Sequence, residues 1–391
     1  MITSFADLLH PHDPDLLLAA ARDGRRLLLR TDRAGQFGKL MSWERFNDLI
    51  TPDKVVSGDV EFARSNAILP AEMTIERPKR QKPPIRMRTA ALKQYARQGI
   101  STVINAVERM DPDTRRLAAI LERAFHAPVQ VNLYASFGKG SAFKPHWDGH
   151  NVLVLQLHGR KLWHSWGQPW QAPRSHALCT VPDQLGEPEF EVLLEPGDLL
   201  YLPRGEVHAA SLSSDADSMH LTLGIAPPGF EALTAALAAA CQSEGLARQD
   251  LPILADEHRK SEWMNDARQL LHRAVDALDL DGLLGMLDSQ VEPLPAGFFG
   301  VDHRIHAGTL VLPTLRRRLH TQISPNGGGE IHAGSQNWTV DGIECEILRL
   351  ITGPHRRSVA DLAEALGDGE RRSTTDVVAR LAHKGLVTLH N

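Results

Sequence analysis

The chain has 391 residues, a formal net charge of −5, 42% hydrophobic residues and 23% charged residues. Its length exceeds what one hydrophobic core usually organises, so two or three domains are expected, and its composition excludes a chain that is disordered throughout. The small net charge argues against a nucleic-acid or anionic-membrane surface spread over the whole molecule and leaves room only for a local basic patch.

The cysteines and the hydrophobic segments indicate a reduced, cytoplasmic compartment. Cys179, Cys241 and Cys345 lie far apart, and an odd count without a CxxC pair favours neither a disulfide framework nor a cysteine zinc site. No apolar run is long enough to cross a bilayer, and the start 'MITSFADLLHPHDPD' meets acidic residues and prolines before an apolar leader could form. We therefore expect a cytoplasmic protein that is neither exported nor held in a membrane.

Residues 1 to about 125 mix short helical patterns with strand-like segments. In 'SWERFNDLI', residues 42–50, apolar residues recur at helical spacing behind Ser42, which suits an N-cap. The Pro- and Arg-rich 'IERPKRQKPPIRMR', residues 75–88, predicts a solvated excursion because prolines and charges together resist packing. An α/β arrangement is therefore expected for this part of the chain.

From about residue 129 to residue 228 the sequence becomes rich in β-forming residues. Four runs stand between clusters of Gly, Pro, Asp and Ser: 'VQVNLYAS', 'NVLVLQLHG', 'FEVLLEPGDLLYLP' and 'MHLTLGI'. Short strands separated by such turn signals predict an antiparallel sandwich or barrel.

This β-rich region contains a candidate metal site in the stretch 'FKPHWDGHNVLVLQLHGRKLW', residues 143–163. In an extended chain His146 and Asp148 point to one face while Trp147 points to the other. An HxD pair is weak evidence in a chain with 19 histidines, but His208 follows the turn and strand of 'EPGDLLYLP' and supplies a third ligand. Two His and one carboxylate are typical of non-haem Fe(II) oxygenases, whereas the HExxH spacing of many zinc sites is absent.

Lys161, near the end of the same apolar stretch, has two interpretations. Inside a barrel its charge would need an anionic partner to offset desolvation, and a dicarboxylate co-substrate would provide one. Alternatively, Arg160 and Lys161 form a charged hairpin corner, and the spacing alone favours this second interpretation.

Residues 230–300 are expected to form a helical bundle. The segments 'FEALTAALAAACQSEGLA' and 'EWMNDARQLLHRAVDALDLDGLLGMLDSQV' are rich in Ala and Leu, with apolar residues three and four apart. They hold more apolar helix than a linker needs, and such a surface left in water would be an unusual exposed patch. We therefore expect a homodimer formed through a mostly helical two-fold interface.

The C-terminal region offers three helical patterns and then a strand: 'DGIECEILRLITG', 'SVADLAEALG', 'STTDVVARLAHKG' and 'LVTLH'. Ser358 with Asp361, and Ser373 with Asp376, stand at capping-box spacing, and the third helix is expected to stop at Gly385. Three helices followed by a strand in this order predict a winged-helix unit.

Winged helices often bind DNA, but the candidate recognition helix, residues 374–384, suits that function poorly. Its cations are Arg380 and Lys384, opposed by Asp376, and the acidic segment 'DLAEALGDGE' lies just upstream. Phosphate neutralisation needs several well-placed cations. We therefore expect a role in packing or substrate docking and no DNA binding.

Taken together, these motifs resemble the JmjC-type ribosomal oxygenase family, the cupin-like 2-oxoglutarate oxygenases that hydroxylate ribosomal proteins. The segments 'NLYASFGKGSAFKPHWDGHNVLVLQLHGRKLW', 'LEPGDLLYLPRGEVHAA' and 'SMHLTLGI' carry the resemblance, from about residue 132 to residue 225. It implies a mainly β catalytic core with a double-stranded β-helix, an α/β N-terminal part, a helical dimerisation region and a C-terminal winged helix. The implied boundaries are 1–228, with the barrel core at about 125–228, then 229–310 and 311–391.

By position, the resemblance places the Fe(II) ligands of the family on His146, Asp148 and His208. The basic residue that pairs with the distal carboxylate of 2-oxoglutarate falls on Lys161, which favours the buried interpretation over the charged corner.

The resemblance also implies two polar co-substrate contacts on a neighbouring strand. These fall on Asn132 and Tyr134, which are two residues apart and so share a face. Ser218 and His220 are candidates for supporting positions around the site. Three further histidines are expected to have surface or supporting roles: His150, His158 and His164.

The implied activity is hydroxylation of a protein side chain, either Arg or His of a ribosomal protein. Two alternatives stay open: a hydroxylase of a natural-product precursor peptide, and a catalytically silent cupin-like protein that binds partners in the cleft between barrel and winged helix. The intact triad and Lys161 argue against a silent protein. Uncoupled 2-oxoglutarate turnover with added Fe(II) would distinguish an enzyme from the silent binder.

Overall fold

The structure is a computed structural model of the whole chain. It describes residues 2–50, 60–64, 67–69, 75–76, 86–87, 89–138, 140–141, 143–174, 180–182, 184–212, 216–296, 305–317, 319, 322–323, 328–367 and 371–391. In this part of the chain, no helix is both long and apolar enough to span a membrane.

The N-terminal part mixes helices and strands, as predicted. Ser42 caps α4 by accepting a hydrogen bond from the backbone N–H of Arg45 at 3.1 Å, which confirms the predicted cap. Of segment 75–88, only the short strands β4 and β5 are described, so most of the predicted excursion lies outside the described residues. The elements in chain order are α1 (Phe5–Leu9), α2 (Pro14–Arg22), β1 (Leu27–Arg30), α3 (Ala34–Leu40), α4 (Trp43–Leu49), β2 (Val60–Arg64), β3 (Ala67–Leu69), β4 (Ile75–Glu76), β5 (Arg86–Met87), α5 (Thr89–Arg97), β6 (Ser101–Ile104), a 3-10 turn (Val107–Arg109) and α6 (Pro112–Phe125).

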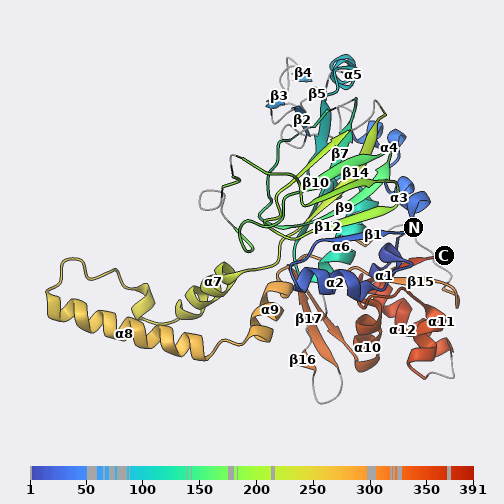
Figure 1. Ribbon diagram of the computed structural model, residues 1–391. Coiled ribbons are helices and arrows are strands. Elements are labelled where there is room, and N and C mark those ends of the chain that lie inside the picture. The colour runs from blue at the N-terminus through green and yellow to red at the C-terminus, as the bar shows by residue number, and fades with distance from the viewer. Residues whose placement is uncertain are drawn as a thin grey trace.

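Two antiparallel sheets build the β-rich region (Figure 1). The larger has the strand order β1-β12-β9-β14-β7-β6-β2-β3, and the smaller has the order β11-β10-β13-β8. The strands not yet introduced are β7 (Val129–Ser136), β8 (Gly140–Ser141), β9 (Asn151–His158), β10 (Lys161–Ser165), β11 (Phe190–Leu194), β12 (Asp198–Leu202), β13 (His208–Leu212) and β14 (Ser218–Ile225). The predicted antiparallel β core is confirmed, and strands β1, β2, β3 and β6 of the N-terminal part extend its larger sheet.

One predicted run divides between the two sheets. The segment 'FEVLLEPGDLLYLP' contains β11 and β12, which belong to the smaller and the larger sheet, respectively. Gly197, at φ +100°, lies in the turn between them and donates its N–H to the carbonyl of Gln156. That conformation favours glycine, so the turn can reverse the chain sharply here.

The alternating side chains of β9 serve two hydrophobic cores. Leu153, Leu155 and Leu157 pack on the helical side of the larger sheet, whereas Val152 and Val154 pack between the sheets with Trp163. A strand buried on both faces reads as a continuous apolar run, which is why residues 152–157 lack a polar/apolar alternation.

The region after β14 forms an extended arm: α7 (Phe230–Cys241), a 3-10 turn (Leu246–Arg248), α8 (Glu257–Asp276) and α9 (Leu280–Ser289). Figure 1 shows α8 projecting away from the body. The predicted helices are present, but they do not close a bundle within one chain. Their buried cluster comprises only Cys241, Leu270 and Ala274, with Leu237 and Leu246 packed against it.

The C-terminal region follows the predicted order of three helices and a strand. The capping box of Ser358 and Asp361 is confirmed, whereas α12 begins at Arg371, so Ser373 lies inside the helix and the predicted cap there is wrong. The elements are β15 (Leu310–Pro313), β16 (Gln322–Ile323), β17 (Gly329–Ala333), β18 (Gln336–Val340), α10 (Gly342–Ile351), β19 (Arg357–Ser358), α11 (Val359–Ala365), α12 (Arg371–His383) and β20 (Val387–His390). Strands β19, β15 and β20 form one small sheet, and β16, β17 and β18 form another.

The two cations of the third helix are held inside this region. Arg380 pairs with Asp341 at 2.9 Å and with the buried Glu344 at 3.3 Å, and Lys384 pairs with Glu344 at 2.6 Å. Both cations are therefore committed to the packing of α12 against α10.

Candidate metal centre

Backbone pairing holds the two histidines of the triad next to each other. His146 and His208 form an isolated antiparallel bridge, in which each N–H donates to the carbonyl of the other at 3.0 and 2.8 Å. The carbonyl of Asp148 accepts from the N–H of Gly205 at 3.1 Å. The ligand loop before β9 is thus fastened at two points to the segment that enters β13.

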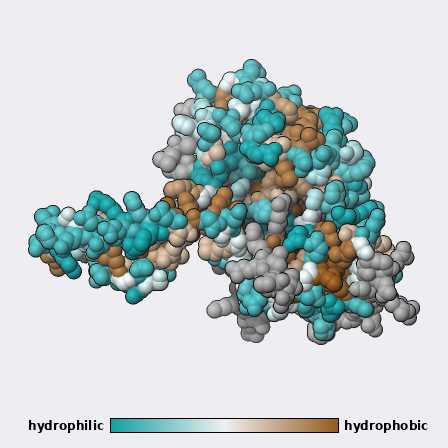
Figure 2. Space-filling model, turned by 90° about the horizontal axis from the view of Figure 1, so that it is seen from below, coloured by the Kyte–Doolittle hydropathy of each residue, from teal (hydrophilic) through white to brown (hydrophobic). Residues whose placement is uncertain are grey.

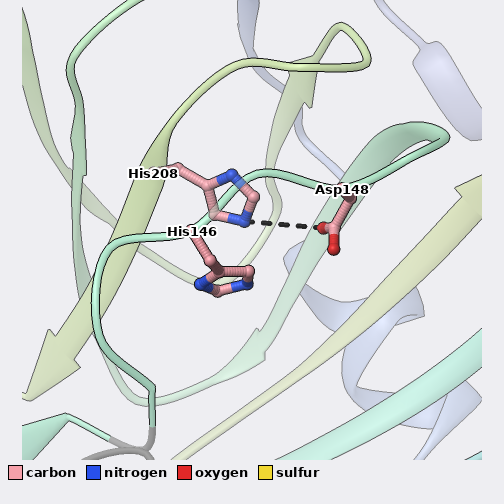
Figure 3. Close-up of side chains that lie close together, drawn as sticks. All are labelled: His146, Asp148 and His208. Carbon is pink, nitrogen blue, oxygen red and sulfur yellow. Dashed lines mark ion pairs between the residues drawn. The ribbon is translucent and has the colours of Figure 1, made fainter. Parts of the chain in front are cut away.

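The side chains of the triad converge in one place (Figure 3). One possible ligand atom from each of His146, Asp148 and His208 lies within 4.8 Å of the others. The Nδ1 atom of His146 donates to the carbonyl of Lys144 at 2.8 Å, and that of His208 donates to the carbonyl of Glu206 at 2.9 Å. These bonds fix the tautomer that leaves each Nε2 free to bind a metal.

The surroundings of His208 favour the protonation state that binds a metal. Burial, reinforced by the neighbouring His146, lowers the pKa of His208 to about 4, although Asp148 opposes the shift. His208 is therefore neutral at pH 7, as ligation requires. Two imidazoles and a carboxylate fit Fe(II), with positions left for further ligands.

A buried polar cluster supports the segment before His208. Glu206 is buried, accepts a hydrogen bond from the Ser165 hydroxyl at 2.5 Å and pairs with Arg26. Because the Glu206 carbonyl receives the His208 Nδ1–H, this cluster orients the imidazole. The sequence gives no signal for this cluster, since Arg26, Ser165 and Glu206 are far apart along the chain and only the fold joins them.

Lys161 is the first residue of β10 and is only 3% exposed. Its Nζ donates to the Ser136 hydroxyl at 2.6 Å, and no described carboxylate lies within ion-pair distance of it. Burial lowers the pKa of Lys161 to about 8. Arg160, in contrast, is exposed and pairs with Glu195 at 2.9 Å. The charged-corner interpretation therefore holds for Arg160 and is wrong for Lys161.

Two further polar atoms in the metal cavity have no hydrogen-bond partner among the residues that the structure describes: Nδ1 of His220 and Nε1 of Trp163. Burial, together with the charge of Lys161, lowers the pKa of His220 well below its usual range, so this imidazole is neutral. Its ring stacks on Tyr134 with the centroids 4.8 Å apart. Buried polar atoms normally find partners, so this cavity suits a polar ligand that would supply them.

Asn132 and Tyr134 share a face of β7 but line different cavities. Tyr134 lines the metal cavity, whereas Asn132 lines an adjoining cavity of about 450 Å³, and Thr222 borders both. The Asn132 Oδ1 accepts from the N–H of Ala106 at 3.1 Å, and a side-chain hydrogen bond links Asn132 to Tyr134. Ser218 is buried at the end of β14, where its hydroxyl accepts from Nε2 of Gln156 at 2.9 Å.

The three histidines without an assigned role lie outside the ligand cluster. His158 donates from Nε2 to the Met41 carbonyl at 2.8 Å, and His164 pairs with Glu191 at 2.8 Å. His150 lines the adjoining cavity.

With this geometry in place, comparison with known proteins shows which domain surrounds the triad. Residues 104–233 match the JmjC domain. The chain is 36% identical to rat "Ribosomal oxygenase 1" over 145 residues, which are 36% of this chain and 24% of that protein. Residues 104–233 form a JmjC domain that is similar to the domain of ribosomal oxygenases.

A second relative of this JmjC protein is "Bifunctional lysine-specific demethylase and histidyl-hydroxylase NO66" of Drosophila persimilis, 28% identical over 195 residues. That match covers 50% of this chain and 27% of the relative, so the JmjC protein spans about a quarter of the length of these relatives. Among solved structures, E. coli YcfD, a ribosomal oxygenase, shares the fold with a TM-score of 0.54 and 17% identity, over 98% of this chain and 99% of YcfD. A further YcfD structure, with a TM-score of 0.53 and 17% identity over the same shares, is a complex with cobalt and 2-oxoglutarate.

Proposed function

We propose that this JmjC protein is an Fe(II)- and 2-oxoglutarate-dependent oxygenase that hydroxylates a side chain of a ribosomal protein. One observation carries the proposal: His146, Asp148 and His208 share a cavity with a buried lysine that has no described carboxylate partner. A metal-binding triad alone would suit many reactions. Because the same cavity also contains the cation of Lys161 without a described carboxylate partner, it favours an anionic co-substrate.

His146, Asp148 and His208 would hold the iron. When bound, Fe(II) supplies the oxidative chemistry, and the protein supplies binding, orientation and exclusion of water. The hydrogen bonds from both Nδ1 atoms to backbone carbonyls keep the imidazoles directed at the metal. The donor set has the composition of the two-histidine, one-carboxylate sites of such enzymes.

Lys161 would bind the distal carboxylate of 2-oxoglutarate, helped by the Ser136 hydroxyl that already contacts its Nζ. Tyr134 would contact the same co-substrate from β7. Asn132 would act through its hydrogen bond to Tyr134, because its own side chain lines the adjoining cavity. Trp163 and Val152 shield this cavity from water as apolar walls.

The adjoining cavity would receive the substrate. It borders the metal cavity at Thr222 and is lined by polar side chains, including Gln130 and Glu108, which suits an extended loop of a ribosomal protein. Among the described residues that line the metal cavity, Asp148 is the one acid, and it is a metal ligand. A guanidinium would need further carboxylates, so we favour histidine over arginine as the hydroxylated residue.

The other parts of the chain would assist this reaction. The arm formed by α7, α8 and α9 would mediate a homodimer. The C-terminal region would be a winged helix that docks the substrate, since Arg380 and Lys384 are committed to internal ion pairs.

The proposal is tested by incubating the protein with Fe(II), 2-oxoglutarate and ribosomal proteins from cells that lack it. We expect succinate formation and a mass increase of one oxygen atom on a single histidine. His146→Ala and Asp148→Ala should abolish both signals while the circular dichroism spectrum is unchanged, and Asp148→Glu should fail as well, because its added methylene displaces the carboxylate. A protein without 2-oxoglutarate turnover under any condition would instead be a silent cupin-like binder. Succinate formation with only a precursor peptide as substrate would support the natural-product alternative.

A further inference from the structure

A cavity of about 380 Å³ lies between the N-terminal helices, α6 and the C-terminal region. It shares no described lining residue with the metal cavity. Figure 1 shows α1 and α2 next to β15, and the N–H of Ala6 donates to the carbonyl of Pro354 across this boundary at 2.9 Å. Its volume and its place between two parts of the chain are typical of small-molecule sites.

Arg123 gives this cavity a buried positive charge. The side chain belongs to α6, is 8% exposed and donates from Nη1 to the carbonyl of Leu315 at 2.7 Å. No described carboxylate forms an ion pair with it, because the adjacent Glu122 pairs with Arg316 and Arg317. Burial lowers the pKa of Arg123 to about 10, so it stays charged at neutral pH. A buried guanidinium without a carboxylate is stabilised by an anionic ligand.

Thr3 provides an independent indication of a polar ligand. Its hydroxyl is buried, has no hydrogen-bond partner in the described part of the chain and belongs to the lining of the same cavity. The exposed rim adds Arg356, whereas Arg349 on the same rim already pairs with Glu346, and Asp15 is the one acid among the described lining residues. The lining therefore favours a negative charge.

The remaining walls are largely apolar. Leu18 of α2, Ile120 of α6 and Leu312 of β15 line the cavity, with Leu319 nearby in the lining. An inorganic anion would leave these side chains without contacts, whereas a ligand with a hydrocarbon body would cover them.

We propose that this cavity binds a small amphipathic carboxylate, of the class of medium-chain fatty acids. The carboxylate contacts the Arg123 guanidinium and the Thr3 hydroxyl, and the hydrocarbon chain lies against Leu18, Ile120 and Leu312. In the buried part of the cavity, one guanidinium and one hydroxyl match a monoanion, whereas a phosphate there would leave oxygen atoms without donors. This ligand is separate from the reaction at the metal and would join the N-terminal and C-terminal parts of the chain.

Titration calorimetry with octanoate on the full-length protein tests this site. We expect a dissociation constant below about 1 mM, since a ligand of this size in a preformed pocket reaches that range. Octan-1-ol lacks the charge and inorganic phosphate lacks the chain, so each should bind at least tenfold more weakly. The proposal would be overturned if phosphate bound as tightly as octanoate. It would also be overturned if octanoate did not bind at a concentration ten times the expected dissociation constant.

Two matched variants locate the binding. Leu18→Trp places a larger side chain in the cavity from a partly buried position and should weaken octanoate at least tenfold. Leu16→Trp, on the same helix, changes an exposed residue outside the lining and should leave the affinity unchanged. Arg123→Gln should also abolish binding, provided that its circular dichroism spectrum is that of the parent protein. Octanoate binding that survives Leu18→Trp, or that Leu16→Trp weakens equally, would place the ligand elsewhere and refute the assignment.

Discussion

Lys161 is a buried cation of the barrel. Among the described residues, the Ser136 hydroxyl is the one side-chain group that accepts a hydrogen bond from its Nζ. Losing one partner of a buried charge pair typically changes the binding free energy by about 3–5 kcal/mol. Lys161→Ala should therefore raise the apparent KM for 2-oxoglutarate by roughly two orders of magnitude or more, at ~1.4 kcal/mol per tenfold. Lys161→Arg should do less harm because it keeps the charge, and bound iron, measured by metal analysis, should be unchanged in both. An unchanged KM in Lys161→Ala would remove Lys161 from the co-substrate site.

The lowered pKa of Lys161 predicts how binding depends on pH. Its ammonium loses its proton as the pH rises through about 8 in the free protein, well below the usual 10.5. The KM for 2-oxoglutarate should therefore rise above pH 8. Lys161→Arg should show no such rise between pH 8 and pH 9.5, because arginine stays charged. Parallel pH profiles for the parent and this variant would contradict the assignment of the titration to Lys161.

The lowered pKa of Lys161 also makes the free energy of unfolding depend on pH. Between about pH 8 and pH 10.5 the unfolded chain binds more protons at this lysine than the folded chain does. The contribution of Lys161 to the free energy of unfolding therefore increases as the pH rises through that window. Below about pH 8 the buried lysine is charged, and its full desolvation cost destabilises the folded protein.

At the scale of elements, the turn between β9 and β10 sets the register of Lys161. Gly159 has φ +62°, and a Cβ there would lie 2.0 Å from the Asp217 carbonyl oxygen. Gly24 has the same φ, but a Cβ there would meet nothing within 4 Å. Gly24→Ala should therefore lower the free energy of unfolding only by the strain of a left-handed non-glycine residue, about 1–2 kcal/mol. Gly159→Ala should destabilise the protein clearly more, because backbone must also move. Urea unfolding of both variants measures the difference, and equal midpoints would contradict the clash.

The sequence predicted the strands whose signal is local. The predicted runs 129–136, 151–159 and 219–225 correspond to β7, β9 and β14, because β-branched and aliphatic residues fill them between turn residues. The sequence could not predict which strands pair. β1 pairs with β12 across about 170 residues, and β11 and β12 belong to different sheets although a single turn separates them. The start of α12 was missed because Arg371 and Arg372 favour helix as well as Ser373 favours a cap.

For the site, the sequence predicted those residues that have metal-ligating side chains and also follow the two-residue alternation of a strand. His146 and Asp148 alternate along one segment, and His208 follows a turn-and-strand signal, so their nearness in space could be expected. Ser136 and Thr222 continue the alternation of Asn132, Tyr134 and His220, and that pattern could have revealed them. Glu206 gave no such signal, because its burial depends on Arg26 and Ser165 from distant segments.

At the scale of the whole molecule, Glu122 joins three parts of the chain. It is 1% exposed, and Arg316 donates two hydrogen bonds of 2.6 Å to its carboxylate. Arg317 also contacts Glu122, at 3.3 Å, and reaches Asp288 at 3.4 Å. Glu122→Gln removes the charge that pairs with the buried Arg317 and the partly buried Arg316, and it should lower the free energy of unfolding by about 3–5 kcal/mol.

The control for Glu122 is an exposed ion pair in the same molecule. Glu346 pairs with Arg349 on the surface of α10, so Glu346→Gln should change the free energy of unfolding by less than about 1 kcal/mol. Both values come from urea titrations followed by circular dichroism. A loss in Glu122→Gln no larger than in the control would show that the buried cluster does not hold these parts together.

The arm exposes an apolar stripe that a second copy of the chain would cover. Met264, Leu271 and Val275 lie seven and four residues apart on α8 and are 45%, 50% and 54% exposed, and Leu254 before the helix is fully exposed. Figure 2 shows apolar residues at the base of the arm and along its edge. This spacing places the stripe on one helix face, and a single chain offers too little core to bury it.

We therefore predict a homodimer through the arm. Light scattering at micromolar concentration should give twice the chain mass of 43.1 kDa, also in high salt, because an apolar interface is not screened. Leu271→Glu combined with Val275→Glu should yield monomers, since each buried carboxylate would lie in the interface without a partner. Ile343→Glu places the same charge on an exposed apolar residue of α10, 48% exposed, and should leave the dimer intact. A parent protein that is monomeric at these concentrations, or a dimer that survives the double substitution on α8, would rule out the arm as the interface.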